Sequence, residues 1–205
     1  MAALKARCVL VTGSNRGIGL EMVRQLAAKS NGPERIFATC RDPEGPRAQK
    51  LKELAAKHKE VEIIQLDASE PSSIKSAAVR VSEQLKGTGL NLLVNNAATL
   101  NVNTLETETA EGMAEVYRTN VIGPFVTSQA ALNMLTKCQS LGYTDDKILC
   151  VALHPGWVQT DMGSAAGRTP LTVDQSVGAI LNTLAHLSEK ENGTFVNWEG
   201  NAVPW

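Results

Sequence analysis

The chain has 205 residues, 43% hydrophobic and 20% charged, and its 20 Lys and Arg against 21 Asp and Glu give a net charge of −1. Such length and apolar content are typical of one soluble globular domain, here 1–205, and exclude a largely disordered chain. A near-zero charge excludes binding through a broad basic surface, so we expect no nucleic-acid and no membrane partner.

The cysteines and the N-terminal segment favour a cytoplasmic location. The first apolar run, Cys8–Val11, is too short for the core of a signal peptide or for a membrane span. The four cysteines, at positions 8, 40, 138 and 150, form no C-x-x-C pair, and three of them lie in apolar runs. We therefore expect free thiols rather than two disulfides.

Short apolar strands alternate with helical patterns along the chain. In chain order, the pattern predicts a strand at Cys8–Val11, a helix at Ile18–Lys29, a strand at Ile36–Cys40, a helix at Arg47–Lys59, a strand at Val61–Leu66, a helix at Pro71–Lys86, a strand at Leu90–Val94, a long helix at Thr109–Leu141, a strand at Ile148–Leu153, a mobile loop at Gly163–Thr169, a helix at Val173–Leu187 with Thr172 as N-cap, and a strand at Thr194–Trp198. Short strands that are apolar on both faces and separated by helices predict an α/β fold with a parallel sheet.

A glycine-rich turn follows the first strand directly. Thr12–Gly19 has the spacing T-G-x-x-x-G-x-G, which is neither G-x-G-x-x-G nor a P-loop. By the same mechanics, Gly13 would permit a tight turn, Gly17 would let a pyrophosphate approach the backbone, and Gly19 would let the helix pack on the strand. The turn therefore predicts a dinucleotide phosphate site, with an ordinary strand–helix turn as the alternative.

Polar residues follow two further strands. Asp67-Ala68 ends the third strand and Asn95-Asn96-Ala97-Ala98 ends the fourth. Open α/β sheets bind ligands at the carboxyl ends of their strands, so these residues are candidate ligand contacts. Each alone would be read as a helix cap or a turn. Beside the glycine-rich turn, they indicate one common site.

In these motifs, together with Arg41-Asp42-Pro43, Asn120-Val121 and His154–Met162, the chain resembles the short-chain dehydrogenase/reductase family, in its carbonyl-reductase-like branch of C-factor and sniffer-type proteins. The resemblance covers nearly the whole chain. It implies a Rossmann-type, doubly wound parallel sheet that binds NAD(P)(H), and NADPH-dependent reduction of small carbonyl compounds. It also implies that Asn120 helps to hold a proton-relay water and that Pro155–Thr160 contacts the nicotinamide end.

Charge at the end of the second strand bears on the choice of cofactor. An acidic residue there binds ribose hydroxyls and repels a 2′-phosphate, whereas an arginine does the reverse. Arg41 comes first and Arg16 could approach the same phosphate, so we expect NADP(H) rather than NAD(H), with Asp42 as the competing signal. The expected cofactor-binding residues are Gly13, Ser14, Asn15, Arg16, Gly17, Ile18, Gly19, Arg41, Asp67, Ala68, Asn95, Ala97, Asn120, Pro155, Gly156, Val158 and Thr160. No cluster of side chains has metal-ligand spacing, so we expect no metal.

The family's catalytic groups are missing from their expected place. The resemblance implies a Ser on a strand, followed by Tyr-x-x-x-Lys on a helix before the His154 strand. Instead, the chain joins Val126–Gln129 to a segment that looks like the back half of the catalytic helix, with the join near 129–131. About one βα unit of ~30 residues or more is absent. The chain therefore looks like a shortened isoform, either alternatively spliced or mis-predicted, in which Asn120 is the only catalytic remnant.

Tyr143 and Lys147 match Tyr-x-x-x-Lys by spacing but not by context. Gly142 precedes them, Asp145-Asp146 suits a turn, and a strand follows at once. A spacing of four aligns two side chains on a helix and not in a turn. We therefore interpret the pair as a decoy. His154 stands before Pro155 and is expected to serve the turn.

These observations leave several functional hypotheses. The favoured one is an NADP(H)-binding protein with impaired or absent reductase activity. One alternative is an active oxidoreductase that uses Tyr143 and Lys147, or a water near Asn120. Another is a noncatalytic isoform that forms homo-oligomers, or hetero-oligomers with a full-length form. For the sheet, we expect the order 3-2-1-4 followed directly by the Ile148 and Thr194 strands, with a gap as the alternative.

Overall fold

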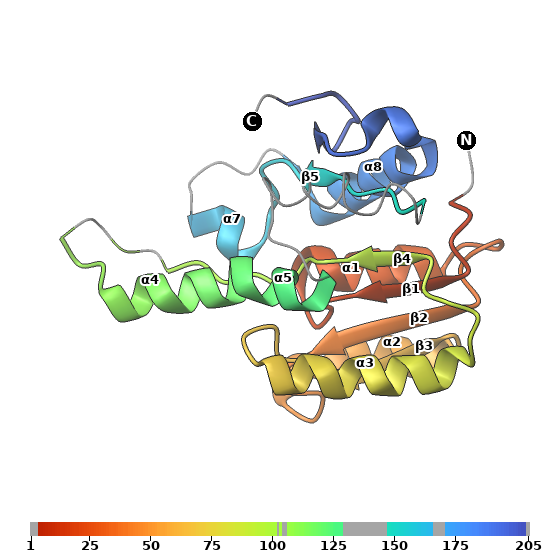
Figure 1. The fold of residues 1–205 in the computed structure, drawn as a ribbon, viewed down its shortest axis with the longest axis horizontal. Coiled ribbons are helices and arrows are strands. Elements are labelled where there is room, and N and C mark those ends of the chain that lie inside the picture. The colour runs from red at the N-terminus through yellow and green to blue at the C-terminus, as the bar shows by residue number, and fades with distance from the viewer. Residues whose placement is uncertain (1–3, 102, 104–105, 129–146, 166–170, 204–205) are drawn as a thin grey trace. The chain divides into compact units, whose positions relative to one another are not determined.

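The computed structural model describes residues 4–101, 103, 106–128, 147–165 and 171–203. Its contacts divide the chain into two compact units. One unit is Lys5–Thr127, and the other is Ser128–Trp205 with Met1–Leu4. Figure 1 shows the elements of both, and each unit is described by itself below.

The unit Lys5–Thr127 is built on a parallel sheet of four strands in the order β3-β2-β1-β4. The expected parallel α/β fold and this part of the strand order are confirmed. The elements of the unit are β1 (Cys8–Val11), α1 (Gly17–Ala27), β2 (Arg35–Cys40), the 3-10 helix η1 (Pro46–Ala48), α2 (Gln49–Lys57), β3 (Val61–Gln65), α3 (Pro71–Leu85), β4 (Leu92–Val94), α4 (Ala110–Tyr117), the π-helix η2 (Arg118–Ile122) and α5 (Gly123–Ser128).

The long helix expected at Thr109–Leu141 is interrupted in its described part. The π-helix η2 separates α4 from α5, which begins at Gly123, directly before Pro124. Proline has no N–H for the regular helical ladder, which accounts for a change of helix geometry at this point. Residues 129–141 of the expected helix lie outside the described residues.

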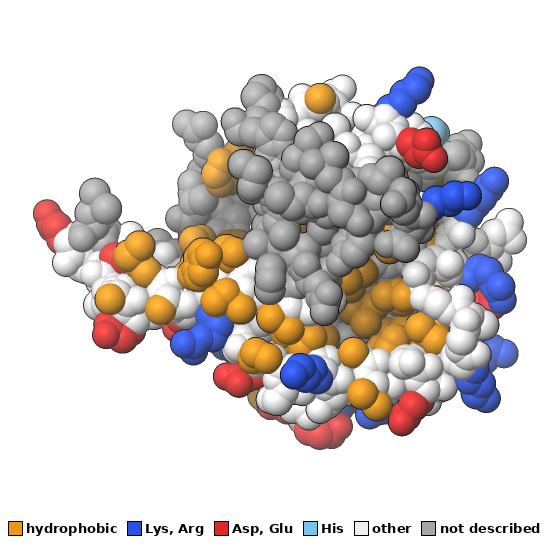
Figure 2. All heavy atoms as spheres, viewed as in Figure 1, with side chains coloured by type: hydrophobic (Ala, Val, Ile, Leu, Met, Phe, Trp, Pro, Cys, Tyr) orange, Lys and Arg blue, Asp and Glu red, His pale blue; other side chains and the backbone are white. Residues whose placement is uncertain are grey.

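Helix α4 contributes no buried residue to its unit. The side chains of Met113 and Tyr117 are 64% and 58% exposed, and Ile122 after them is also exposed. Figure 2 shows hydrophobic side chains along this helix at the left of the view. An apolar stripe that stays exposed on a helix often marks a surface that contacts another molecule.

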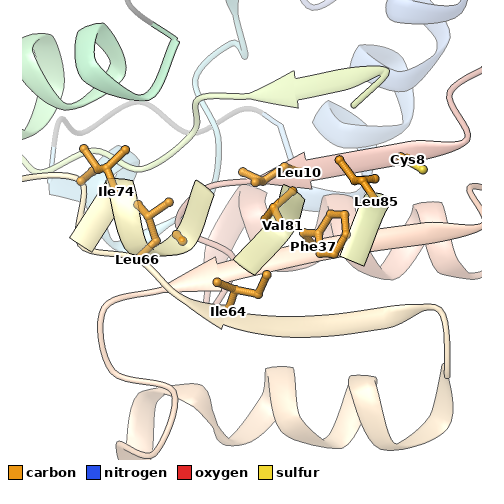
Figure 3. Packing of buried hydrophobic residues seen from close by; sticks show 10 residues of the cluster. Cys8, Leu10, Phe37, Ile64, Leu66, Ile74, Val81 and Leu85 are labelled. Atoms are coloured by element: carbon orange, nitrogen blue, oxygen red, sulfur yellow. The ribbon is translucent and has the colours of Figure 1, made fainter. Parts of the chain in front are cut away.

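One hydrophobic cluster of this unit lies between the sheet and α3, and helices α1 and α2 bury further apolar residues, among them Val23, Leu26 and Leu51. Helix α3 buries Ile74, Ala77, Val81 and Leu85, whose spacing places them on one face of the helix. Figure 3 shows labelled members of this face beside Leu10, Phe37 and Ile64 of the sheet. The core therefore holds the sheet and α3 together, so that the carboxyl ends of the strands have fixed positions.

The second unit contains its own pair of parallel strands. Its elements are β5 (Ala152–His154), α7 (Asp161–Ala165), α8 (Val173–His186), the 3-10 helix η3 (Glu189–Glu191) and β6 (Phe195–Asn197). The predicted N-cap is confirmed, because the Thr172 hydroxyl accepts the Gln175 N–H at 3.2 Å and the Gln175 side chain accepts the Thr172 N–H at 3.1 Å.

One expectation for this unit is wrong in part. Residues 163–165 of the loop expected at Gly163–Thr169 are helical, because α7 ends at Ala165 and the Thr160 hydroxyl accepts the Gly163 N–H at 3.1 Å. Residues 166–169 lie outside the described residues. The expected pairing of the Ile148 and Thr194 strands is confirmed, because β5 pairs with β6, and the expected ladder between the Leu90 and Ile148 strands stays a prediction. Among the described strands, β4 pairs with β1, whereas β5 pairs with β6. The strands β5 and β6 flank α8 and form a βαβ unit, so β5 finds its partner locally.

Candidate functional site

The glycine-rich turn has the backbone shape that its glycines predict. Gly13 has a φ of +67°, and a Cβ atom there would lie 2.8 Å from the Cα atom of Ala97. Gly19 lies in the first turn of α1, where a Cβ atom would collide with the Gly13 carbonyl oxygen. Only glycine fits these two positions without displacing backbone.

A network of hydrogen bonds joins this turn to the segment after β4. The Thr12 hydroxyl accepts the N–H groups of Asn96 and Ala97, each at 2.9 Å. The Asn96 side-chain amide donates to the carbonyl oxygens of Thr12 and Gly13, at 2.9 and 3.2 Å. Thr12 is 2% exposed. The expected pair of loops at the carboxyl ends of β1 and β4 therefore forms one connected structure.

Thr12 and Asn96 are not among the expected cofactor-binding residues, although Asn96 lies in a segment of candidate ligand contacts. Both lie within motifs singled out from the sequence, but their partners are 84 residues apart along the chain. Asn95, which was included, is half-buried, and its side chain makes no hydrogen bond with any described residue. A polar pair at the end of a strand signals a turn, without indicating which of its members faces inward.

The N-terminus of α1 has neither a side-chain cap nor an acidic residue to offset the positive end of the helix dipole. Arg16 is the N-cap residue in extended conformation, no side chain caps the helix, and no acidic residue lies in the first turn. The first N–H groups of a helix lack intrahelical partners and attract anions. Ser14 is buried, and its hydroxyl donates to the Val11 carbonyl at 2.8 Å, so it shapes the turn. The first turn of α1 is thus suited to bind a phosphate, whereas Asn15 and Ile18 beside it are half-buried.

Arg41 follows β2 with an exposed side chain. Its guanidinium makes no hydrogen bond or ion pair within the part of the chain that the structure describes, whereas its carbonyl oxygen accepts the Gln65 side-chain N–H at 3.0 Å. The next carboxylate, that of Asp42, accepts the N–H groups of Glu44 and Gly45 at 3.1 and 2.9 Å. The Arg41 guanidinium is therefore open to a ligand at the end of β2, whereas one oxygen of the Asp42 carboxylate is held by the turn. Directly before Arg41, burial raises the pKa of the Cys40 thiol, and the charge of Asp42 raises it further.

Asp67 and Ala68 lie where β3 leads into α3. One carboxylate oxygen of Asp67 accepts the N–H and the hydroxyl of Ser69, at 2.9 and 2.7 Å, so Asp67 shapes the turn before α3. Its other carboxylate oxygen has no partner in the described residues. Ala68 is buried, and a Cβ atom at Gly123 of α5 would collide with its carbonyl oxygen.

Asn120 lies in the π-helix η2 and binds the backbone of Thr99. Its side-chain oxygen accepts the Thr99 N–H at 2.8 Å, and its side-chain nitrogen donates to the Thr99 carbonyl at 2.7 Å. Both ends of the amide are thus engaged in holding the segment that follows Asn95–Ala98. The implied role of Asn120 beside a proton-relay water stays a prediction.

The remaining cofactor candidates lie in the second unit, after β5. The Pro155 carbonyl accepts the hydroxyl of Ser176 at 2.7 Å, and Gly156, with a φ of +83°, donates its N–H to the His154 ring at 3.0 Å. Val158 is buried, and the Thr160 hydroxyl holds the start of α7. The expectation that His154 serves this turn is confirmed.

The decoy pair is described in part. Tyr143 lies outside the described residues. Lys147 is exposed in a turn with a φ of +56°, which is not helical. Because Lys147 is not in a helix, a spacing of four does not place it on a common helix face with Tyr143.

Other kinds of site find no support in the described part of the chain. Within it, no group of three or more His, Cys, Asp and Glu side chains could hold a metal ion. No described helix is both long and apolar enough to cross a membrane.

Known proteins resemble this chain over most of its length. The model of the family described as short chain dehydrogenase matches residues 7–140. The NADPH-bound carbonyl reductase from chicken fatty liver is 45% identical, with a TM-score of 0.93 and coverage of 98% of this chain and 100% of that one. Carbonyl reductase Sniffer of D. melanogaster is 28% identical, with a TM-score of 0.89 and coverage of 97% and 99%.

A curated relative also bears on the expected deletion. An uncharacterized oxidoreductase of Schizosaccharomyces pombe is 26% identical over 249 residues, which cover 95% of this chain and 96% of the relative. Because this chain has 205 residues, at least 44 of those 249 aligned positions have no counterpart in it. The expected deletion near 129–131 stays a prediction, because the alignment length does not locate these positions.

Proposed function

Because this chain belongs to the short-chain dehydrogenase family, we propose that it binds NADP(H) but has little or no carbonyl reductase activity. The observation that carries the proposal is the combination at the ends of β1 and β2. The uncapped N-terminus of α1 suits a pyrophosphate, and the unpaired guanidinium of Arg41 suits a 2′-phosphate. The NADPH-bound relative supports this choice of cofactor.

The residues present fit such a cofactor at its adenosine and pyrophosphate end. Gly13, Gly17 and Gly19 would hold the pyrophosphate, with Arg41 at the 2′-phosphate and the free carboxylate oxygen of Asp67 at the adenine. Ala97 and Asn95 would line the same site. Pro155, Gly156, Val158 and Thr160 are the candidates for the nicotinamide end.

The loss of activity follows from proton transfer. NADPH, when bound, supplies a hydride to a carbonyl carbon, and the carbonyl oxygen then needs a proton from a positioned acid. Removing such an acid typically lowers the rate by a factor of about 10² to 10⁴. Lys147 lies in a turn and Asn120 is engaged with Thr99, so neither takes over the role of the missing Tyr-x-x-x-Lys pair.

Calorimetry with NADPH and with NADH tests the proposal. We expect NADPH to bind more tightly than NADH, and we expect Arg41→Asp to remove or reverse that preference. Equal binding of both dinucleotides by the unchanged protein, or no binding of either, would refute the proposed cofactor.

A second candidate function is favoured by the exposed side of α4. A noncatalytic isoform could modulate a complete reductase by associating with it, and Met113 and Tyr117 offer an apolar surface for that contact. Copurification with a complete reductase, compared between Met113→Glu and the matched exposed change Val79→Glu on α3, tests this function.

The free, buried thiols of Cys8 and Cys40 suit a reducing compartment and support the proposed cytoplasmic location.

A further inference from the structure

We propose that Asp42 positions Arg41 for a 2′-phosphate by holding the turn 42–45, and that it does not select NAD(H) through a ribose contact. This inference rests on the proposed function. In the sequence, the negative charge of Asp42 favours NAD(H), whereas Arg41 favours NADP(H).

The carboxylate of Asp42 is directed into its own turn. One oxygen accepts two backbone N–H groups, from Glu44 at 3.1 Å and from Gly45 at 2.9 Å. The other oxygen occupies the space that a Cβ atom at Gly45 would fill. The turn therefore holds the carboxylate through one oxygen and packs the other against Gly45, so we infer that the carboxylate serves the turn rather than a ribose.

The backbone on both sides of Arg41 is held as well. The Cys40 carbonyl accepts the Leu66 N–H at 2.9 Å, and the Arg41 carbonyl accepts the Gln65 side chain at 3.0 Å. These two bonds anchor the residue from β3, and the turn held by Asp42 anchors it from the following side. The backbone of Arg41 is thus held by hydrogen bonds, while its guanidinium is exposed.

The other acidic side chain of this turn, that of Glu44, has an ion-pair partner of its own. Glu44 pairs with Lys52 of α2 at 2.6 Å, and the Arg41 guanidinium has no ionic partner in the described ranges. An arginine on an ordered backbone loses less loop freedom when it binds a phosphate, and an unpaired guanidinium has no ion pair to give up.

Substitutions in the turn separate the effect of the hydrogen bonds from the effect of the charge. Asp42→Ala removes both. Asp42→Asn removes the charge, but its amide oxygen can accept the same two N–H groups. Gly45→Ala keeps the charge and displaces the carboxylate, and it adds no backbone strain because Gly45 has φ −70° and ψ 161°. Glu44→Gln is the charge control, because it removes one negative charge from the same turn.

The probes are adenosine 2′,5′-bisphosphate and AMP, measured by calorimetry, so that the nicotinamide end plays no part. The unchanged protein is expected to prefer the bisphosphate. Asp42→Ala and Gly45→Ala should reduce this preference by about two- to tenfold, the worth of one or two hydrogen bonds. Asp42→Asn should keep the preference or increase it by no more than Glu44→Gln does.

Hydrogen exchange of the unliganded protein gives a readout that needs no nucleotide. The amides of Glu44 and Gly45 should exchange faster in Asp42→Ala and Gly45→Ala than in the unchanged protein and in Asp42→Asn. An Asp42→Ala variant that binds the bisphosphate more tightly, or that matches Asp42→Asn in both measurements, would overturn the inference alone. An unchanged protein that does not prefer the bisphosphate would refute the proposed function, and this inference with it.

Discussion

Thr12 and Asn96 hold each other's backbone across 84 residues of chain. The Thr12 hydroxyl accepts the Asn96 N–H at 2.9 Å, and the Asn96 side chain donates to the Thr12 carbonyl at 2.9 Å. The same hydroxyl also accepts the N–H of Ala97. The shape of the glycine-rich turn therefore depends on the segment after β4 as well as on its own glycines.

The first prediction concerns this pairing. Thr12→Val keeps the shape of the side chain but leaves the N–H groups of Asn96 and Ala97 without their acceptor. We expect the free energy of unfolding to fall by about 2 kcal/mol, because the lost acceptor is buried. Urea unfolding measures the change. Thr12→Ser, which keeps the hydroxyl, should lose much less, and equal losses in the two variants would contradict the assigned role.

The second prediction compares two glycines within helices. Replacing an exposed helical glycine by alanine normally stabilises a helix by about 1 kcal/mol, and we expect this gain for Gly178→Ala in α8. Gly19→Ala should instead destabilise the protein and weaken NADPH binding, because the added methyl group would collide with the Gly13 carbonyl. Thermal unfolding and calorimetry of both variants test this contrast. A stabilised Gly19→Ala variant that binds NADPH normally would show that the turn tolerates the methyl group.

The third prediction concerns catalysis. With a panel of reactive aldehydes and quinones, NADPH oxidation should be about 10²- to 10⁴-fold slower than that of a complete carbonyl reductase assayed beside it. Tyr143→Phe and Lys147→Ala should change this rate little. Robust turnover that Tyr143→Phe abolishes would make the pair catalytic. Robust turnover that neither change affects would favour an active enzyme that uses a water near Asn120.

The fourth prediction is a pH dependence at two cysteines. Burial raises the pKa of both Cys40 and Cys150, and the charge of Asp42 raises that of Cys40 further. Asp42→Asn should therefore lower the pKa of Cys40 and leave that of Cys150 unchanged. Titration of ¹³Cβ-labelled cysteine by NMR resolves the two thiols, and equal responses would show that Asp42 does not act on Cys40.

The sign of the linked stability follows from the same shifts. A raised pKa in the folded state means that the folded protein holds its proton more tightly than the unfolded chain does. The stabilisation is present below the unfolded pKa of a cysteine and is lost as the pH rises through the folded value. Denaturant unfolding of the unchanged protein should therefore show decreasing stability in the alkaline range, and Asp42→Asn should show a smaller decrease.

The sequence by itself determined the local elements of this protein. Apolar runs located the strands, the periodicity of α3 indicated its buried face, and Thr172 marked the start of α8. The glycine spacing after β1 predicted the turn into α1. Each of these features depends on residues within a few positions of one another, so local pattern and backbone sterics suffice to predict them.

Only the tertiary structure decided which polar groups are engaged. The sequence does not show that the side chains of Asp42, Asn96 and Asn120 hydrogen-bond to backbone groups, which the structure shows for all three. A polar side chain and a strand edge have many partners of equal chemistry, and the choice among them depends on which segments the folded chain brings together.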